Sequence, residues 1–174
     1  MKVAFDTGIL IAWLDPSATK ALSVSDGPAR VEHLVKTLTE QNATIVIPTP
    51  ALSEFLVLAA TQSPSYVHQL SRSPVVRIRP FDLRAAVEAA EAHEHATRQG
   101  NKKDGATGTW QKVKVDRQIV AIAKVHNVYW LYADDRDIKN LAVSMGVPVK
   151  LLESLPLPPA TLFSHSGIPE PEPR

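Results

Sequence analysis

Four acidic residues stand where a carboxylate can take part in chemistry, and they are Asp6, Glu54, Asp116 and Asp135. Two of them follow short apolar runs, and the other two lie within apolar helical patterns. Carboxylates gathered in one place bind hard divalent cations such as Mg²⁺ and Mn²⁺, which neutralise a phosphate and activate a water molecule. Without a cation the same carboxylates would repel one another. Acids gathered in this way therefore predict a metal-dependent active site.

Glu54 and Asp116 are predicted to lie on apolar helix faces. Glu54 is the only Asp, Glu, Lys or Arg between residues 48 and 71, and Asp116 is followed at helical spacing by Ile119 and Val120. A carboxylate that faces a core is costly unless it is paired, hydrogen-bonded or bound to a metal. Two simpler explanations stay open. Glu54 can reach solvent or an arginine at a helix end, and Asp116 can interact with the helix dipole.

The other two acids belong to the ends of predicted strands. Asp6 directly follows the first strand, and a role as N-cap of the next helix explains its position equally well. The strand predicted at residues 128–132 runs into Asp134, Asp135 and Asp137 before another helix. We assign Asp137 as the cap of that helix. Either Asp134 or Asp135 is then left to point across the strand ends toward Asp6.

The elements that must position these acids alternate along the chain. Runs of β-branched and aromatic residues predict strands at 2–5, 44–47 and 128–132, with less regular candidates at 74–78 and 147–149. Helical patterns occupy 29–42, 50–61, 83–99, 114–126 and 137–145. This alternation predicts an α/β fold, a three-layer α/β/α sandwich with a central, mostly parallel sheet of about five strands. Such sheets place their sites at the carboxyl ends of the strands.

Composition narrows the class of protein further. The chain has 174 residues, 44% of them apolar, and six of its fourteen prolines lie at the C-terminal end. We therefore expect one domain at residues 1–153 and a proline-rich tail at 154–174. The absence of cysteine excludes disulfides, thiolate metal sites and a cysteine nucleophile. No apolar run approaches the roughly 20 residues that span a bilayer, so we expect a cytoplasmic protein.

A basic, glycine-containing segment precedes the helix of Asp116. Residues 99–109 hold three of the seven glycines and no apolar periodicity, which predicts a mobile loop. The basic residues expected to contact nucleic acid are Lys102, Lys103, Lys112, Lys114 and Arg117. A solvated basic loop is the alternative explanation. His93 and His95 do not predict zinc, because residues two apart on a helix point away from each other.

Four ordered segments around the acids resemble the PIN-domain ribonucleases, a family that includes the VapC-type toxins of bacterial toxin–antitoxin pairs. The segments are Val3-Ala4-Phe5-Asp6-Thr7, Ala51-Leu52-Ser53-Glu54-Phe55, Val115-Asp116-Arg117-Gln118-Ile119-Val120-Ala121 and Leu131-Tyr132-Ala133-Asp134-Asp135-Arg136-Asp137. Each segment is short, and their order and placement on strand ends and helices make the combination specific. The resemblance covers roughly residues 1–150.

The resemblance implies a set of functional expectations. Asp6, Glu54, Asp116 and Asp135 would bind Mg²⁺ or Mn²⁺, with Asp134 and Asp137 as assisting neighbours. The substrate would be RNA, the products would carry a 5′-phosphate, and the partners would be an antitoxin protein and a second copy of the chain.

Two positions depart from the usual pattern of that family. Gly8 stands where Ser, Thr or Asn commonly follows the first Asp by two, and Ala133 stands where Thr commonly precedes the last acid by two. Both replace groups that would orient carboxylates or water. The alternative function is therefore a catalytically weak or inactive PIN-like module that binds RNA or a protein partner. A phosphatase of the aspartyl-phosphate type is disfavoured, because Gly8 stands where its general acid would be.

Overall fold

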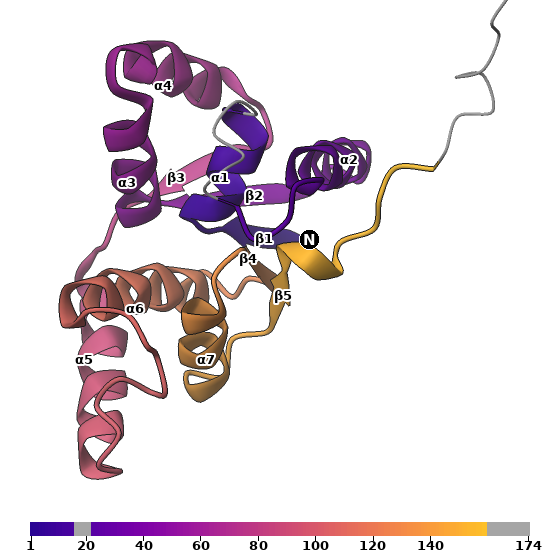
Figure 1. Ribbon diagram of the computed structural model, residues 1–174. Helices are drawn as coiled ribbons and strands as arrows, with labels where there is room; N and C mark the ends of the chain where they lie inside the picture. Colours follow the sequence, from indigo (N-terminus) through magenta and orange to yellow (C-terminus); the bar gives the residue numbers. More distant parts are fainter. Residues whose placement is uncertain (16–21, 160–174) are drawn as a thin grey trace, which may run out of the picture.

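The centre of the molecule is a five-stranded parallel sheet with the strand order β3-β2-β1-β4-β5 (Figure 1). The computed structural model describes residues 1–15 and 22–159. The strands are β1 (Lys2–Phe5), β2 (Thr44–Pro48), β3 (Val76–Arg79), β4 (Trp130–Ala133) and β5 (Val149–Leu151). In the central strand β1, Ala4 pairs with Val46 on one side and with Leu131 on the other. Because all the strands are parallel, their carboxyl ends share one edge of the sheet.

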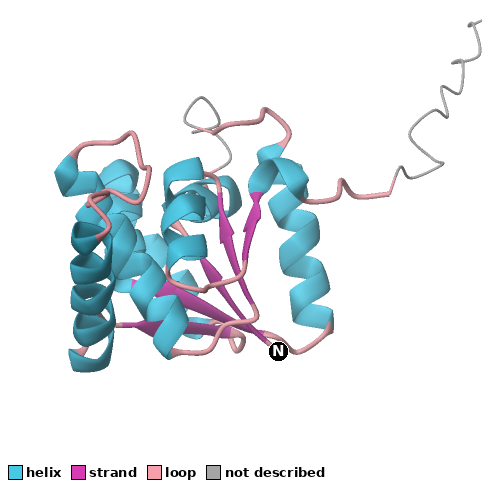
Figure 2. Cartoon of the chain, turned by 90° about the horizontal axis from the view of Figure 1, so that it is seen from below, coloured by secondary structure: helices cyan, strands magenta, loops and turns pink. Residues whose placement is uncertain are grey.

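Helices cover both faces of this sheet (Figure 2). In the described part of the chain they are α1 (Thr7–Leu14), α2 (Gly27–Glu40), α3 (Thr49–Ala59), α4 (Ser63–Arg72), α5 (Leu83–Arg98), α6 (Trp110–Val125) and α7 (Arg136–Ser144). Short 3₁₀ helices follow α3 at Ala60–Gln62 and β5 at Leu152–Ser154. The α/β fold with its parallel five-stranded sheet is confirmed.

The core is built from the residues that gave the strand predictions. Val3, Ala4 and Phe5 are fully buried, so β1 is covered on both faces, as a run without polar alternation predicts. Phe5 packs edge-on against Trp13 of α1 and Tyr132 of β4. The central strand therefore links the first helix to the strand that follows much later in the sequence, and this link fixes the edge on which the acids meet.

The observed helices differ from the predicted ones in two respects. Helices α1 and α4 were not among the predicted ranges, and α1 is apolar along most of its length, so no polar face reveals a helical period there. Helix α6 begins at Trp110 rather than at residue 114, because the hydroxyl of Thr109 accepts a hydrogen bond from the Lys112 N–H and caps the helix.

The chain beyond the last strand stays packed for a short distance. Leu155 is buried, and its carbonyl accepts a hydrogen bond from the Arg30 guanidinium of α2. The predicted tail from residue 160 onward lies outside the described residues. Among the helices that the structure describes, none combines the length and apolar character needed to cross a bilayer.

Candidate active site

A pocket of about 440 Å³ opens where the carboxyl ends of β1 and β4 meet helices α1, α3, α6 and α7. Its polar lining consists of Asp6, Thr7, Glu54, Lys112, Asp116, Asp134 and Asp135. The four acids predicted as metal ligands are thus brought to one cavity from four separate parts of the sequence. Asp137, the sixth acid of the prediction, does not line this pocket.

Asp6 is both a helix cap and a pocket acid. Its Oδ1 accepts a hydrogen bond of 2.8 Å from the Ile9 N–H at the start of α1, and its Oδ2 accepts one of 3.0 Å from the Asp134 N–H. Burial raises the pKa of this carboxyl to about 7, although both backbone hydrogen bonds act in the opposite direction. The two explanations for Asp6 are therefore compatible, because the cap itself holds the carboxylate at the pocket.

Asp116 carries the clearest unsatisfied group of the site. It is 2% exposed, and its Oδ2 has no hydrogen-bond partner within the described residues. The nearest cation, the Lys112 ammonium one helical turn earlier, lies 3.6 Å from that oxygen. Burial raises the pKa of Asp116 to about 7, and Lys112 opposes this shift only in part. A buried carboxylate oxygen of this kind suits a cation in the adjoining cavity.

Glu54 lies at the rim of the pocket rather than against a core. Val57 and Leu58, which form part of the apolar helix face predicted around Glu54, are 76% and 61% exposed. Expecting Glu54 to face the core was therefore wrong, because α3 turns this side toward the opening of the cavity. The hydroxyl of Thr7 donates a hydrogen bond to Glu54 Oε2, which connects α1 to α3 across the pocket.

Among the three acids after β4, the capping role expected of Asp137 belongs to another residue. Asp135, not Asp137, is the N-cap of α7, and its Oδ1 accepts a hydrogen bond of 2.7 Å from the Asp137 N–H. The second oxygen of Asp135 forms an ion pair with Lys112. The assignment of Asp137 as the cap was therefore wrong, since the cap preference is common to neighbouring acids and only the backbone angles decide between them.

Asp137 instead anchors the loop that precedes α6. Its carboxylate accepts hydrogen bonds from the N–H groups of Thr107, at 3.0 Å, and Gly108, at 2.8 Å. Although burial opposes the change, these bonds lower the pKa of Asp137. An ionised carboxylate satisfied by the backbone in this way has a structural role.

Gly8 packs closely against Asp134. A Cβ atom at position 8 would lie 2.5 Å from the Cβ of Asp134, which is far inside van der Waals contact. The Asp134 carboxylate accepts hydrogen bonds from the N–H and the hydroxyl of Ser23, so it turns toward the segment before α2. The glycine at this departure from the family pattern thus has a packing reason.

The predicted nucleic-acid contacts separate into exposed and internal groups. Lys102 and Lys114 lie over the ring of Trp110, with their Nζ atoms 4.5 Å and 5.5 Å from its centroid. Lys103 donates a hydrogen bond of 2.9 Å to the Gly108 carbonyl within its own loop. Lys112 belongs to the acidic pocket.

Arg117 was predicted to contact nucleic acid, but it is buried inside the protein. It is 3% exposed, and its guanidinium binds Asp104 at 2.8 Å and the Lys102 carbonyl at 3.0 Å. A buried guanidinium that holds a loop is not free to meet a phosphate. Together with Asp137, Arg117 fastens a segment that glycine content alone had suggested to be mobile.

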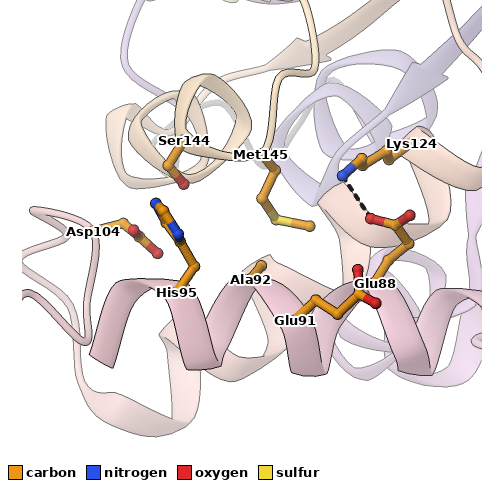
Figure 3. Close-up of a pocket in the computed structure, with 8 residues that line it drawn as sticks. All are labelled: Glu88, Glu91, Ala92, His95, Asp104, Lys124, Ser144 and Met145. Atoms are coloured by element: carbon orange, nitrogen blue, oxygen red, sulfur yellow. Dashed lines mark ion pairs between the residues drawn. The ribbon is translucent and has the colours of Figure 1, made fainter. Parts of the chain in front are cut away.

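A second cavity, of about 250 Å³, lies among α5, α6 and α7 (Figure 3). Glu88 is paired there with Lys124 at 2.6 Å, as the dashed line shows, and Asp104 is paired with Arg117. Because its acids are largely neutralised by internal cations, this cavity is a weaker candidate for a metal than the pocket around Asp116.

The residues of the first pocket fit a hard divalent cation by their chemistry. Its donors are carboxylates, and one buried carboxylate oxygen there lacks a partner. As the side chains stand, no three Asp, Glu or His side chains of the described residues are placed to hold an ion jointly. Asp135 is held by Lys112, and Asp134 by Ser23.

Some residues of the site were not identified from the sequence. Thr7 and Ser23 position Glu54 and Asp134, and neither has a pattern that points to this role. Lys112 was assigned to nucleic acid, yet it lies four residues before Asp116, a spacing that brings opposite charges together on a helix. That spacing was the available signal for its place in the pocket.

The parallel sheet and its flanking helices form a PIN-like α/β fold, which is shared by chains of solved VapBC complexes. One solved relative in structure is the VapBC2 complex of Rickettsia felis bound to a DNA fragment from its promoter, with a TM-score of 0.61 and 18% identity. Another is DNA-bound VapBC from Salmonella typhimurium, with a TM-score of 0.56 and 14% identity. Each match covers 87% of this chain and 98% of the other chain. No family profile and no curated protein matches the sequence.

Proposed function

We propose that this chain is a divalent-metal-dependent endoribonuclease and the toxin of a toxin–antitoxin pair. The observation that carries the proposal is the buried Asp116 Oδ2, which faces a carboxylate-lined pocket without a hydrogen-bond partner in the described chain. A fold needs no such group for its stability, since a buried carboxylate oxygen without a hydrogen bond is destabilising. Its presence at the carboxyl edge of a parallel sheet, in a PIN-like fold, supports a cation-dependent site.

Each acid of the pocket has a distinct part in this proposal. Asp6, Asp116 and Asp135 would hold Mg²⁺ or Mn²⁺, which supplies charge neutralisation at the phosphate and activation of water. Glu54 is free at the rim, where Thr7 fixes one carboxylate oxygen and leaves the other to orient the attacking water. The Asp134 N–H donates a hydrogen bond to the Asp6 carboxylate, which would keep this carboxylate oriented while substrate binds.

The exposed lysines beside Trp110 form a basic surface at the start of α6, the helix that also contributes Lys112 and Asp116 to the pocket. Lys102 and Lys114 present two positive charges on α6 and the loop before it, and Trp110 lies between them. Phosphates are attracted to such clusters, and the salt dependence of binding measures how many contacts form. We propose that single-stranded RNA crosses this surface, and that the net charge of +1 limits binding to this place.

The test is RNA cleavage in Mn²⁺ by the wild type, Asp6→Asn and Asp116→Asn. We expect each Asn variant to lose about 100-fold or more in rate, because removing one charged ligand weakens the ion and its activation of water. Glu94→Gln is the matched control, since it also replaces a carboxylate with an amide, but on the exposed surface of α5. Cleavage by Asp116→Asn at the wild-type rate would contradict the proposal.

An antitoxin is the proposed partner because the two solved structures described above are VapBC complexes. Val57 and Leu58, exposed at the mouth of the pocket, supply the apolar contact that a protein partner would cover. A short reading frame directly upstream in the same operon, whose product co-purifies with the wild type and not with Val57→Asp, would support this partner. Unchanged co-purification of Val57→Asp would exclude this surface.

A catalytically weak or inactive module is the second candidate function. The observation that favours it is the ion pair between Lys112 and Asp135, which engages one of the expected ligands. Titration of the chain with Mn²⁺ separates the two candidates. Absence of binding, with retained RNA or partner binding, would favour the module.

A further inference from the structure

We infer that Lys112 is a built-in cation of the acidic pocket, which competes with the divalent ion and must leave Asp135 before that ion binds. The inference rests on the proposed metal-dependent function and names the residue that sets its metal requirement. It concerns the affinity of the site for metal, which can be measured without any substrate.

The position of Lys112 carries this inference. Its side chain is 42% exposed and rises from the first turn of α6 into the pocket. Its Nζ atom forms an ion pair with Asp135 at the start of α7 and lies 3.6 Å from Asp116 Oδ2. The ammonium thus stands between two acids that come from different helices and that are both expected to hold the metal.

The carboxylates cannot serve both cations at once. The oxygen of Asp135 that pairs with Lys112 is the one not used in capping α7, because the other accepts the Asp137 N–H. A divalent ion that recruits Asp135 therefore takes the oxygen that Lys112 holds. The ammonium and the ion also repel each other over the few ångströms of the pocket.

Asp116 adds a second reason for competition. Its Oδ2 is buried without a hydrogen bond, and its only compensation is the Lys112 ammonium 3.6 Å away. In the metal-free protein Lys112 reduces the repulsion between Asp116 and Asp135, so it stabilises the state that the metal must replace. A direct contact of Lys112 with phosphate is a different role, which would leave metal affinity in the absence of substrate unchanged.

The first measurement is Mn²⁺ affinity by calorimetry on the full chain at neutral pH. We expect Lys112→Met to bind Mn²⁺ about five- to tenfold more tightly than the wild type, because no ion pair has to be broken. Lys112→Arg keeps the charge and should stay near the wild-type affinity. Lys114→Met is the matched control, because it removes the same charge from the same helix beside Trp110 rather than in the pocket.

The second measurement follows the displacement of the ammonium itself. Acetylation of lysines, read by mass spectrometry, should modify Lys112 several-fold faster in Mg²⁺ than in EDTA, with Lys114 as the internal reference. Faster acetylation together with tighter Mn²⁺ binding by Lys112→Met supports the inference. If Lys112 only stabilised the fold, Lys112→Met would lower the melting temperature without tightening metal binding.

Three results would overturn the inference, and they are distinguishable. Equal or weaker Mn²⁺ binding by Lys112→Met removes the competition and leaves the proposed nuclease intact. Tighter binding without faster acetylation of Lys112 means that the ammonium stays in place, which also contradicts the inference. Absence of Mn²⁺ binding by every variant overturns the proposed function and this inference with it.

Discussion

Asp116 and Arg117 are neighbours on α6, both are almost fully buried, and their surroundings are opposite. Arg117 is 3% exposed, and its terminal guanidinium nitrogens are paired with Asp104 and bound to a loop carbonyl and to His93, so that only its Nε lacks a hydrogen-bond partner in the described chain. Asp116 is 2% exposed, and one of its oxygens has no hydrogen-bond partner in the described chain. Successive helical residues point about 100° apart, so one faces the loop side and the other the pocket.

The difference between these two sides of α6 teaches how to separate structural charges from functional ones. On the loop side each carboxylate has partners, since Asp137 accepts two backbone N–H groups and Asp104 meets Arg117. On the pocket side burial exceeds compensation, and it raises the pKa values of Asp6 and Asp116. Groups whose charge the fold does not satisfy are the candidates for a bound ion.

The largest effect on stability is expected from Arg117→Met. Its loss leaves Asp104 poorly compensated and frees the loop, which should lower the free energy of unfolding by about 3 to 4 kcal/mol. Urea unfolding in EDTA measures this change. Arg117→Met combined with Asp104→Asn should recover part of the loss, and an unchanged single variant would place Arg117 outside the structural network.

A smaller and opposite effect is expected from Asp116→Asn. Between pH 4 and pH 7 the folded protein retains a proton on Asp116 while the unfolded chain has released it, so wild-type stability falls as pH rises through this range. Above pH 7 the carboxylate is charged in both states and the deficit is constant.

Urea unfolding of the metal-free wild type and of Asp116→Asn at pH 5 and pH 8 measures this difference. The Asn variant should gain about 2 to 3 kcal/mol relative to the wild type over that interval. If the difference in free energy of unfolding between the two proteins did not depend on pH, the pKa of Asp116 would not be raised in the folded protein. The contrast with Arg117 would then be lost.

Asp137→Ala is expected to destabilise the chain by about 2 kcal/mol, because two backbone N–H groups of the loop lose their acceptor. Metal affinity should change little, because Asp137 does not line the pocket. Thermal unfolding and Mn²⁺ titration check the two halves of this prediction. A strong loss of Mn²⁺ binding would move Asp137 to the pocket side of the comparison.

The smallest effect is expected at Gly8. Gly8→Ala should cost about 1 kcal/mol, because the added Cβ meets Asp134 and the gain in helix propensity offsets part of the strain. A double-mutant cycle with Asp134→Gly, which removes the opposing Cβ, should show a coupling of similar size. Additive effects would mean that the glycine has another reason.

The fold was predictable from the sequence because buried parallel strands leave an apolar run that needs no partner to be recognised. Because the strands could be recognised, the acids that follow their ends could be placed at the carboxyl edge of the sheet. The partners of those acids could not, since whether Asp135 or Asp137 caps α7 depends on backbone angles. Glu54 lines the same pocket as the other acids, although the apolar residues around it were taken for part of a core. In a sequence, apolar side chains at the mouth of a cavity look the same as core residues.

The central position of β1 has a consequence for how the molecule comes into being. The hydrogen bond that holds Asp6 joins it to Asp134, 128 positions later in the chain. Contacts of such separation close late and slow the folding of a domain, because chain entropy opposes them until most of the polypeptide is present. During synthesis the pocket therefore cannot assemble until β4 has left the ribosome, so a shorter nascent chain contains Asp6, Glu54 and Asp116 but neither the last acids nor the site.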